Sequence, residues 1–170
     1  MNMAVYARGE GCIKSLDFTD GASVNFEPAS AFMGDNEDYL DVVAALEKLC
    51  PEAIPNYIRL IFMDTLCANP DRHTNNFGLL RDTATGKLLG LAPNYDNNMA
   101  LISRGYPTKA AATDLLIVLF NELLEEHPEY RDYLPVLTEE AVRGVIAKLN
   151  MKVKTQTIVD YVMGRYALIK

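Results

Sequence analysis

The sequence predicts an α+β protein in which a small antiparallel β part accompanies a mostly helical body. Short apolar runs flanked by turn residues occur in the first 30 residues and again over residues 77–91, which is typical of β-hairpins. Most of the remaining sequence repeats apolar residues at intervals of three and four, which indicates helices. The chain has 170 residues, 49% of them hydrophobic, so a single domain over residues 1–170 with a substantial core is expected.

The N-terminal segment contains the first predicted hairpin. Apolar runs at residues 13–18 and 23–26 flank Thr19, Asp20 and Gly21. The pair Asp-Gly strongly favours a tight hairpin turn. We therefore expect residues 1–30 to form an N-terminal β-hairpin.

Two helices follow the predicted hairpin. One is expected over residues 37–49, with Asn36 as its N-terminal cap. The next is expected over residues 56–67, where mostly apolar residues repeat at intervals of three and four and predict a well-buried helix. Pro70 ends this second helix just before Asp71. Asp71 therefore begins a loop that directly follows a buried helix.

A second hairpin follows that loop. Strands are predicted at residues 77–81 and 87–91, joined by a five-residue connection that ends in Gly86. The outer ends of two antiparallel strands joined in this way lie next to each other. We therefore expect Asn76 and Asp96, which flank the hairpin, to lie close in space.

The C-terminal part of the chain is predicted to be helical. Helices are expected over residues 113–126, 129–133, 139–149 and 156–169, and Thr138 is the expected cap of the third.

The composition of the chain argues against several kinds of binding partner and indicates a cellular location. The net charge of −7 and the pI of about 4.8 argue against direct nucleic-acid binding and against docking on an anionic membrane. No apolar run approaches the roughly 20 residues of a membrane span, and no signal peptide is evident at the N-terminus. Three cysteines at long spacings fit neither a disulfide scaffold nor a zinc site, and a cytoplasmic location is expected.

Four polar residues around the second hairpin form the candidate site. The pattern Asp-x-His-x-x-Asn spans Asp71, His73 and Asn76, and Asp96 follows the second strand. Phosphoryl transfer from ATP needs one carboxylate to orient a hydroxyl, together with an amide and a second carboxylate to hold Mg²⁺. Asp71 is the candidate catalytic base. His73 is the second candidate catalytic residue, and it is expected to order the loop by hydrogen bonding. Asn76 and Asp96 are the candidate ligands of Mg²⁺ and its bound ATP.

Each of these residues also has a plain structural alternative. Asp71 is suited to capping a turn, Asn76 to forming one, and Asp96 to an ordinary loop. Asn75 could be mistaken for the metal ligand, although the spacing favours Asn76. Arg72 could pair with an acidic group or lie solvated on the surface, and the residues alone do not decide between these two positions.

The same residues carry a resemblance to a known family. Residues 71–78 read Asp-Arg-His-Thr-Asn-Asn-Phe-Gly and residues 91–96 read Leu-Ala-Pro-Asn-Tyr-Asp. This combination closely resembles the C-terminal domain of HipA-type kinases, whereas the shorter Asp-Arg-His-x-x-Asn pattern also occurs in phosphatidylinositol kinases. The resemblance implies a bacterial serine/threonine kinase, often the toxin of a toxin–antitoxin module, with a two-lobed protein-kinase-like fold.

The resemblance also implies roles for individual residues. Asp71 would be the catalytic aspartate, Asn76 the catalytic-loop metal ligand, and Asp96 the counterpart of the aspartate in the Asp-Phe-Gly motif of protein kinases. In the family, ATP lies between this helical lobe and a β-rich N-terminal lobe.

The sequence lacks the features of that N-terminal lobe. Gly9, Glu10 and Gly11 form too short a motif for a phosphate-binding loop and are expected to form a turn, and Lys14 is the only lysine before Lys48. We therefore expect a kinase C-lobe whose N-lobe is missing. The expected partners are a separate N-lobe, an antitoxin-like protein or a second copy of the chain.

Three functions are consistent with these observations. The first is a Mg·ATP-dependent transfer of phosphoryl groups to protein serine or threonine, completed by an N-lobe. The second is a catalytically inactive kinase-like domain that serves as a protein-interaction module. The third is an unrelated metal-dependent hydrolase that uses Asp71, His73 and Asp96, which would need more metal ligands than the sequence offers.

Overall fold

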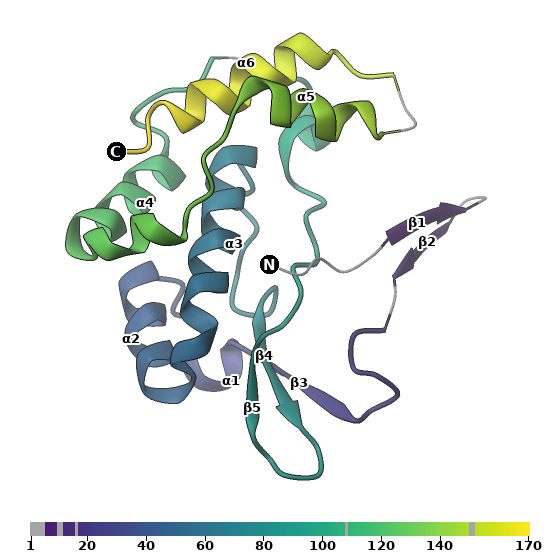
Figure 1. The fold of residues 1–170 in the computed structure, drawn as a ribbon, viewed down its shortest axis with the longest axis vertical. Coiled ribbons are helices and arrows are strands. Elements are labelled where there is room, and N and C mark those ends of the chain that lie inside the picture. Colours follow the sequence, from purple (N-terminus) through teal and green to yellow (C-terminus); the bar gives the residue numbers. More distant parts are fainter. Residues whose placement is uncertain (1–5, 10–11, 16, 108, 150–151) are drawn as a thin grey trace. The chain divides into compact units, whose positions relative to one another are not determined.

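The computed structural model describes residues 6–9, 12–15, 17–107, 109–149 and 152–170. Together these residues form six α-helices and two separate antiparallel β-sheets (Figure 1), so the predicted α+β class is confirmed. The chain divides into two compact units. The first unit comprises Met1–Leu60 and Arg72–Asp96, and the second unit comprises Ile61–Asp71 and Asn97–Lys170. The single domain over residues 1–170 stays a prediction.

A three-stranded sheet organises the first unit. Strand β4 (Gly78–Asp82) lies between β3 (Val24–Pro28) and β5 (Leu88–Leu91), and both pairings are antiparallel (Figure 1). The predicted second hairpin is therefore confirmed as β4 and β5. Its turn is closed by Asp82 Oδ1, which accepts hydrogen bonds from the N–H and the hydroxyl of Thr85, each at 2.7 Å.

The strand pairing predicted for the N-terminal segment is wrong, although residues 1–30 do contain a β-hairpin. Residues 20–23 do form a turn, but β3 pairs with β4 instead of with a strand at residues 13–18. A separate hairpin forms from β1 (Tyr6–Gly9) and β2 (Cys12–Ser15). Glu10 and Gly11, for which a turn was expected, lie outside the described residues. The Asp-Gly pair correctly indicates a change of direction. The choice of pairing partner depends on a distant strand, which a local turn motif cannot reveal.

The pairing of β3 with β4 depends on the absence of a side chain at Gly78. A Cβ at this position would lie 2.2 Å from Glu27 O and 2.8 Å from Pro28 Cα, so the two backbones would have to separate. We expect Gly78→Ala to lower the free energy of unfolding by about 1–3 kcal/mol, the usual cost of overpacking. Urea denaturation followed by circular dichroism measures this change. Gly144→Ala is the control, because a Cβ there meets open space within a helix and should be neutral or stabilising. Equal stabilities of both variants would contradict the close-approach explanation.

Short helices complete the first unit. Helix α1 (Ser30–Met33) follows β3, and helix α2 (Tyr39–Leu49) buries Tyr39, Val42, Val43 and Leu46. The predicted cap at Asn36 is wrong: Asp38 caps α2 by accepting the N–H groups of Leu40 and Asp41. A carboxylate at this position satisfies free N–H groups and also interacts favourably with the helix dipole. A 3-10 helix (Pro51–Ala53) connects α2 to the next helix.

Helix α3 (Ile54–Cys67) belongs to both units, with residues 54–60 in the first and residues 61–67 in the second. It begins two residues before the predicted start and ends at the predicted residue. Cys50, directly after α2, is buried, whereas Cys67 at the end of α3 is partly exposed. Burial, followed by the nearby Asp64 carboxylate, raises the pKa of the Cys67 thiol to about 11.

The second unit is helical. It contains α4 (Leu115–Glu126), α5 (Glu139–Ala147) and α6 (Thr155–Tyr166), with 3-10 helices at Leu101–Arg104 and Pro128–Tyr133. Helices α5 and α6 lie side by side (Figure 1). Thr138 caps α5 through a 3.1 Å bond from the N–H of Ala141, as predicted. Within the part of the chain that the structure describes, no helix combines the length and apolar character needed to cross a bilayer.

A buried arginine connects three segments of the second unit. Arg165 on α6 is fully buried and donates from its two terminal nitrogens to the two carboxylate oxygens of Asp114, at 2.8 and 2.7 Å. Its Nε donates to the carbonyl of Thr65 on α3. Asp114 also caps α4 by accepting the N–H of Leu116. One side chain thus joins α3, the start of α4, and α6.

Candidate functional site

The loop that carries the Asp-x-His-x-x-Asn pattern starts from a firmly capped helix end. After α3, Ala68 adopts a left-handed backbone with φ of 50°, and the N–H of Asn69 donates to Asp64 O at 2.9 Å. The side-chain amide of Asn69 also donates to Asp64 Oδ1 at 2.8 Å, and both side chains are buried. This is the pattern of a Schellman cap, which satisfies helix carbonyls and fixes the direction of the departing chain.

Asp71 follows this cap within the second unit. Its N–H donates to Asn69 Oδ1 at 3.4 Å, and its side chain is partly exposed. The capped helix therefore positions the Asp71 backbone while its carboxylate retains access to solvent. A partly exposed carboxylate on a fixed backbone is chemically suited to orient a hydroxyl group and accept its proton.

His73 makes hydrogen bonds within the loop. Its Nδ1 accepts the N–H of Asn75 at 3.2 Å, so in this arrangement the neutral ring carries its proton on Nε2. Its carbonyl accepts the N–H of Asn76 at 2.8 Å. Thr74 is buried and donates its hydroxyl to Gly34 O at 2.8 Å, which ties the same loop to the end of α1.

The two neighbouring asparagines differ in surroundings. Asn75 is exposed, and its side-chain oxygen accepts the hydroxyl of Ser30 at 2.7 Å. Asn76 is only 5% exposed. The Asn75 amide oxygen is thus bonded to the first residue of α1, and the metal-ligand role assigned to Asn76 from the spacing stays a prediction.

Arg72 joins the two outer ends of the β4–β5 hairpin. Its Nη1 donates to Asn76 O at 2.7 Å and to Tyr95 O at 2.9 Å, and its Nη2 donates to Asn94 Oδ1 at 3.0 Å. Arg72 is 8% exposed, so the alternative of a solvated surface arginine is wrong. Because Tyr95 directly precedes Asp96, the expected approach of the Asn76 and Asp96 segments is present in the backbone. The sequence contains no pattern that distinguishes this buried arginine from an exposed one.

Asp96 sits on a constrained backbone. Its φ is 54°, in the left-handed region that Asp tolerates better than most residues, and its side chain is partly exposed. The preceding Tyr95 packs its ring against Phe18 and Phe26, with centroids 6.0 and 5.7 Å away, and donates its hydroxyl to Asn75 O at 2.6 Å. Unusual backbone conformations held by their surroundings occur preferentially at functional sites.

The donor atoms on these two segments fit a magnesium ion that is shared with phosphate. Asn76 supplies an amide oxygen and Asp96 a carboxylate, and Mg²⁺ takes hard oxygen ligands, few of them from protein. Among the described residues, no group of three His, Cys, Asp or Glu side chains could hold a metal ion. The zinc or two-metal hydrolase alternative would need such a group.

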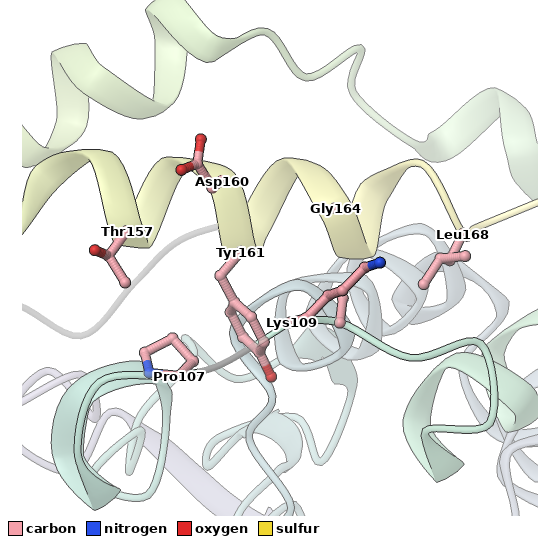
Figure 2. Close-up of a pocket in the computed structure, with 8 residues that line it drawn as sticks. Pro107, Lys109, Thr157, Asp160, Tyr161, Gly164 and Leu168 are labelled. Atoms are coloured by element: carbon pink, nitrogen blue, oxygen red, sulfur yellow. The ribbon is translucent and has the colours of Figure 1, made fainter.

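A cavity of about 490 Å³ lies elsewhere, within the second unit. Figure 2 shows the ring of Tyr161 extending from α6 between Pro107 and Lys109, while the carboxylate of Asp160 points away. None of Asp71, His73, Asn76 and Asp96 lines this cavity.

Known proteins resemble this chain in sequence and in fold. The HipA-like C-terminal domain family matches residues 10–158. Among solved structures, the chain is similar to the crystal structure of a Helicobacter pylori proinflammatory kinase, CtkA, with a TM-score of 0.58 and 15% sequence identity, over 92% of this chain and 72% of that one. This likeness shows a kinase-like fold. No curated protein matches the sequence. Because the family match covers most of the chain, the protein belongs to the HipA-like C-terminal domain family.

Proposed function

We propose that this chain is the C-terminal catalytic lobe of a HipA-like kinase, which transfers a phosphoryl group from Mg·ATP to a serine or threonine hydroxyl of a protein. The observation that carries the proposal is the hydrogen bonding of Asn76 O and Tyr95 O to one nitrogen of the buried Arg72. This pairing supports a shared metal site, because a small ion that binds Asn76 and Asp96 together needs their backbones close to each other.

Each candidate residue has a defined role in this proposal. The Asp71 carboxylate orients the acceptor hydroxyl and takes up its proton. Asn76 and Asp96 hold the metal, and His73 keeps the loop between Asp71 and Asn76 in shape through its bond from Asn75. When bound, Mg²⁺ offsets the negative charge on the transferring phosphate.

A partner lobe completes the proposed kinase. Phosphoryl transfer needs groups that grip the ATP phosphates, and this sequence contains no glycine-rich phosphate loop and only Lys14 as a lysine before Lys48. We propose that a β-rich lobe supplies these groups. An antitoxin-like protein or a second copy of the chain are further proposed partners.

Calorimetric titration of Mg·ATP into the purified protein tests this function. We expect binding in the micromolar to low-millimolar range in the wild type and its loss in Asp96→Ala, which removes the carboxylate ligand. Asp35→Ala is the matched control, because it removes an exposed carboxylate of the same unit and should bind as the wild type does.

Two results would count against the proposal. Equal affinity of Asp96→Ala and the wild type would remove Asp96 from the site. Absence of binding by the wild type would favour the alternative of an inactive kinase-like domain that acts as a protein-interaction module.

A further inference from the structure

The guanidinium of Arg72 links the two strand ends of the β4–β5 hairpin. Three of its hydrogen bonds, described above, end on two backbone carbonyls and one side-chain amide at the open end of this hairpin. The two carbonyls belong to Asn76 itself and to the residue before Asp96. We propose that Arg72 is a positioning residue, which holds the Asn76 and Asp96 backbones at the separation that a shared metal ion requires. This inference rests on the proposed function.

The geometry of one nitrogen makes the link rigid. Nη1 carries two N–H groups, and one of them points to each strand end, so neither carbonyl can move without straining the other bond. The planar fork then directs Nη2 to Asn94. A lysine ammonium could reach some of these oxygens but lacks the flat fork that fixes all three directions at once.

Asn94 holds the second strand end at an additional point. It is 6% exposed, and it lies two residues before Asp96. Arg72 therefore contacts the segment before Asp96 twice, through the Asn94 side chain and the Tyr95 carbonyl. Asp96, with its left-handed backbone, directly follows these two contacts. The direction in which the chain leaves Tyr95, and with it the position of the Asp96 carboxylate, therefore depends on them.

If Arg72 only stabilised the fold, its loss would affect the hairpin differently from the loss of a positioning residue. The hairpin has its own ladder between β4 and β5 and its own turn bonds at Asp82. The Arg72 contacts lie at the opposite end, beyond the ladder. Loss of Arg72 should therefore loosen Asn76 and Asp96 while the ladder stays intact, whereas a general stabilising role would weaken the whole hairpin.

The test compares Mn²⁺ affinity in folded variants, with Mn²⁺ alone as the probe and water-proton relaxation as the readout. We expect Arg72→Lys to bind Mn²⁺ about 10- to 100-fold more weakly than the wild type, the usual effect of removing a group that orients metal ligands. Asn94→Ala removes the bond from Nη2 and leaves both carbonyl bonds of Nη1 in place, so it should weaken binding in the same direction by less. Arg81→Lys is the matched control, because Arg81 bonds Glu27 and Gly86 O at the other end of the hairpin, and it should bind like the wild type.

Amide NMR spectra provide the readout that does not depend on metal. In Arg72→Lys, the amide signals of Asn76 and Asp96 should shift and exchange with solvent faster, while those of the β4–β5 ladder keep their wild-type values. Unchanged Mn²⁺ affinity in both Arg72→Lys and Asn94→Ala would overturn the proposal, and so would unchanged signals at Asn76 and Asp96. If the wild type binds no Mn²⁺, the proposed function fails, and the NMR pattern alone decides whether Arg72 positions these two residues.

Discussion

Replacing Asp114 with alanine is expected to lower the free energy of unfolding by about 3–5 kcal/mol. Asp114 is the counter-ion of Arg165, whose side chain is 1% exposed. Without the carboxylate, a guanidinium remains buried with no opposite charge, which costs far more than a salt bridge gains. Loss of the cap that Asp114 provides to α4 adds about 1 kcal/mol.

The reverse substitution should cost less. Arg165→Met leaves Asp114, which is 32% exposed and can be hydrated, and the methionine side chain fills part of the vacated volume. The cost is then mainly the loss of hydrogen bonds, including that of the Thr65 carbonyl, at about 1–3 kcal/mol for an unsatisfied buried group. The double variant should be more stable than the sum of the two single changes predicts, because it leaves no unpaired buried charge. Urea denaturation followed by circular dichroism measures the free energy of unfolding of the two single variants and the double variant. Additive changes would contradict a direct interaction between Asp114 and Arg165.

The stability that this pair contributes should also depend on pH. The hydrogen bond from Arg165 holds the pKa of the Asp114 carboxyl below its ordinary value. A depressed pKa in the folded state means that the contribution is complete above the unfolded aspartate pKa of about 3.9 and is lost as the pH falls through the folded-state value. The stability difference between the wild type and Asp114→Asn should therefore shrink in that acidic range and stay constant near neutral pH.

Replacing Asp71 with asparagine should reduce phosphoryl transfer by about 100- to 10,000-fold, the usual contribution of a positioned general base. Asparagine keeps the size and the backbone cap from Asn69 but cannot accept a proton. Mg·ATP affinity should not change, because Asp71 is not one of the proposed metal ligands. This separation of rate from affinity distinguishes Asp71 from Asp96.

Single-turnover transfer from radiolabelled ATP is the measurement for Asp71, with the β-rich N-terminal lobe of a HipA-like kinase supplied as a second chain. Asp132→Asn, an exposed carboxylate of the same unit, serves as the control and should transfer at the wild-type rate. A wild-type rate in Asp71→Asn would remove the base role. Calorimetry on the same samples shows whether nucleotide binding was preserved.

Local patterns in the sequence predicted most of the elements because the physical causes are themselves local. Helix periodicity and the Thr138 cap predicted the bounds of α5 to within two residues. The spacing of turn residues predicted the β4–β5 hairpin. The same local reasoning failed for β3. Its partner, β4, is far away in the chain, and the close approach at Gly78 that admits it is a property of the packed sheet.

The buried arginines were beyond sequence reasoning for a different reason. Arg165 occupies a position on α6 that continues the buried stripe of Ile158 and Val162, but its charge predicts exposure. Arg72 is likewise buried, with carbonyl oxygens from two segments accepting its hydrogen bonds. In both cases burial depends on acceptors contributed by other segments. The proposed roles of Asp71, His73, Asn76 and Asp96 remain predictions, whereas the Arg72 bonds to Asn76 O and Tyr95 O agree with the approach of the Asn76 and Asp96 segments that strand pairing predicted.

The strand order β3-β4-β5 has a consequence for the order in which the first unit folds. The β4–β5 hairpin and the Arg72 contacts close short loops, which costs little chain entropy, so they can form early. The pairing of β3 with β4 closes a much longer loop and is expected to form late. When β3 pairs, it brings the neighbouring Phe18, Phe26 and Ser30 into place. Phe18 and Phe26 pack against Tyr95, and Ser30 bonds Asn75. The Arg72 contacts should therefore set the distance between the Asp96 and Asn76 segments early in folding. The Asp96 segment should become rigid only when β3 pairs with β4, which is expected to be the slowest step.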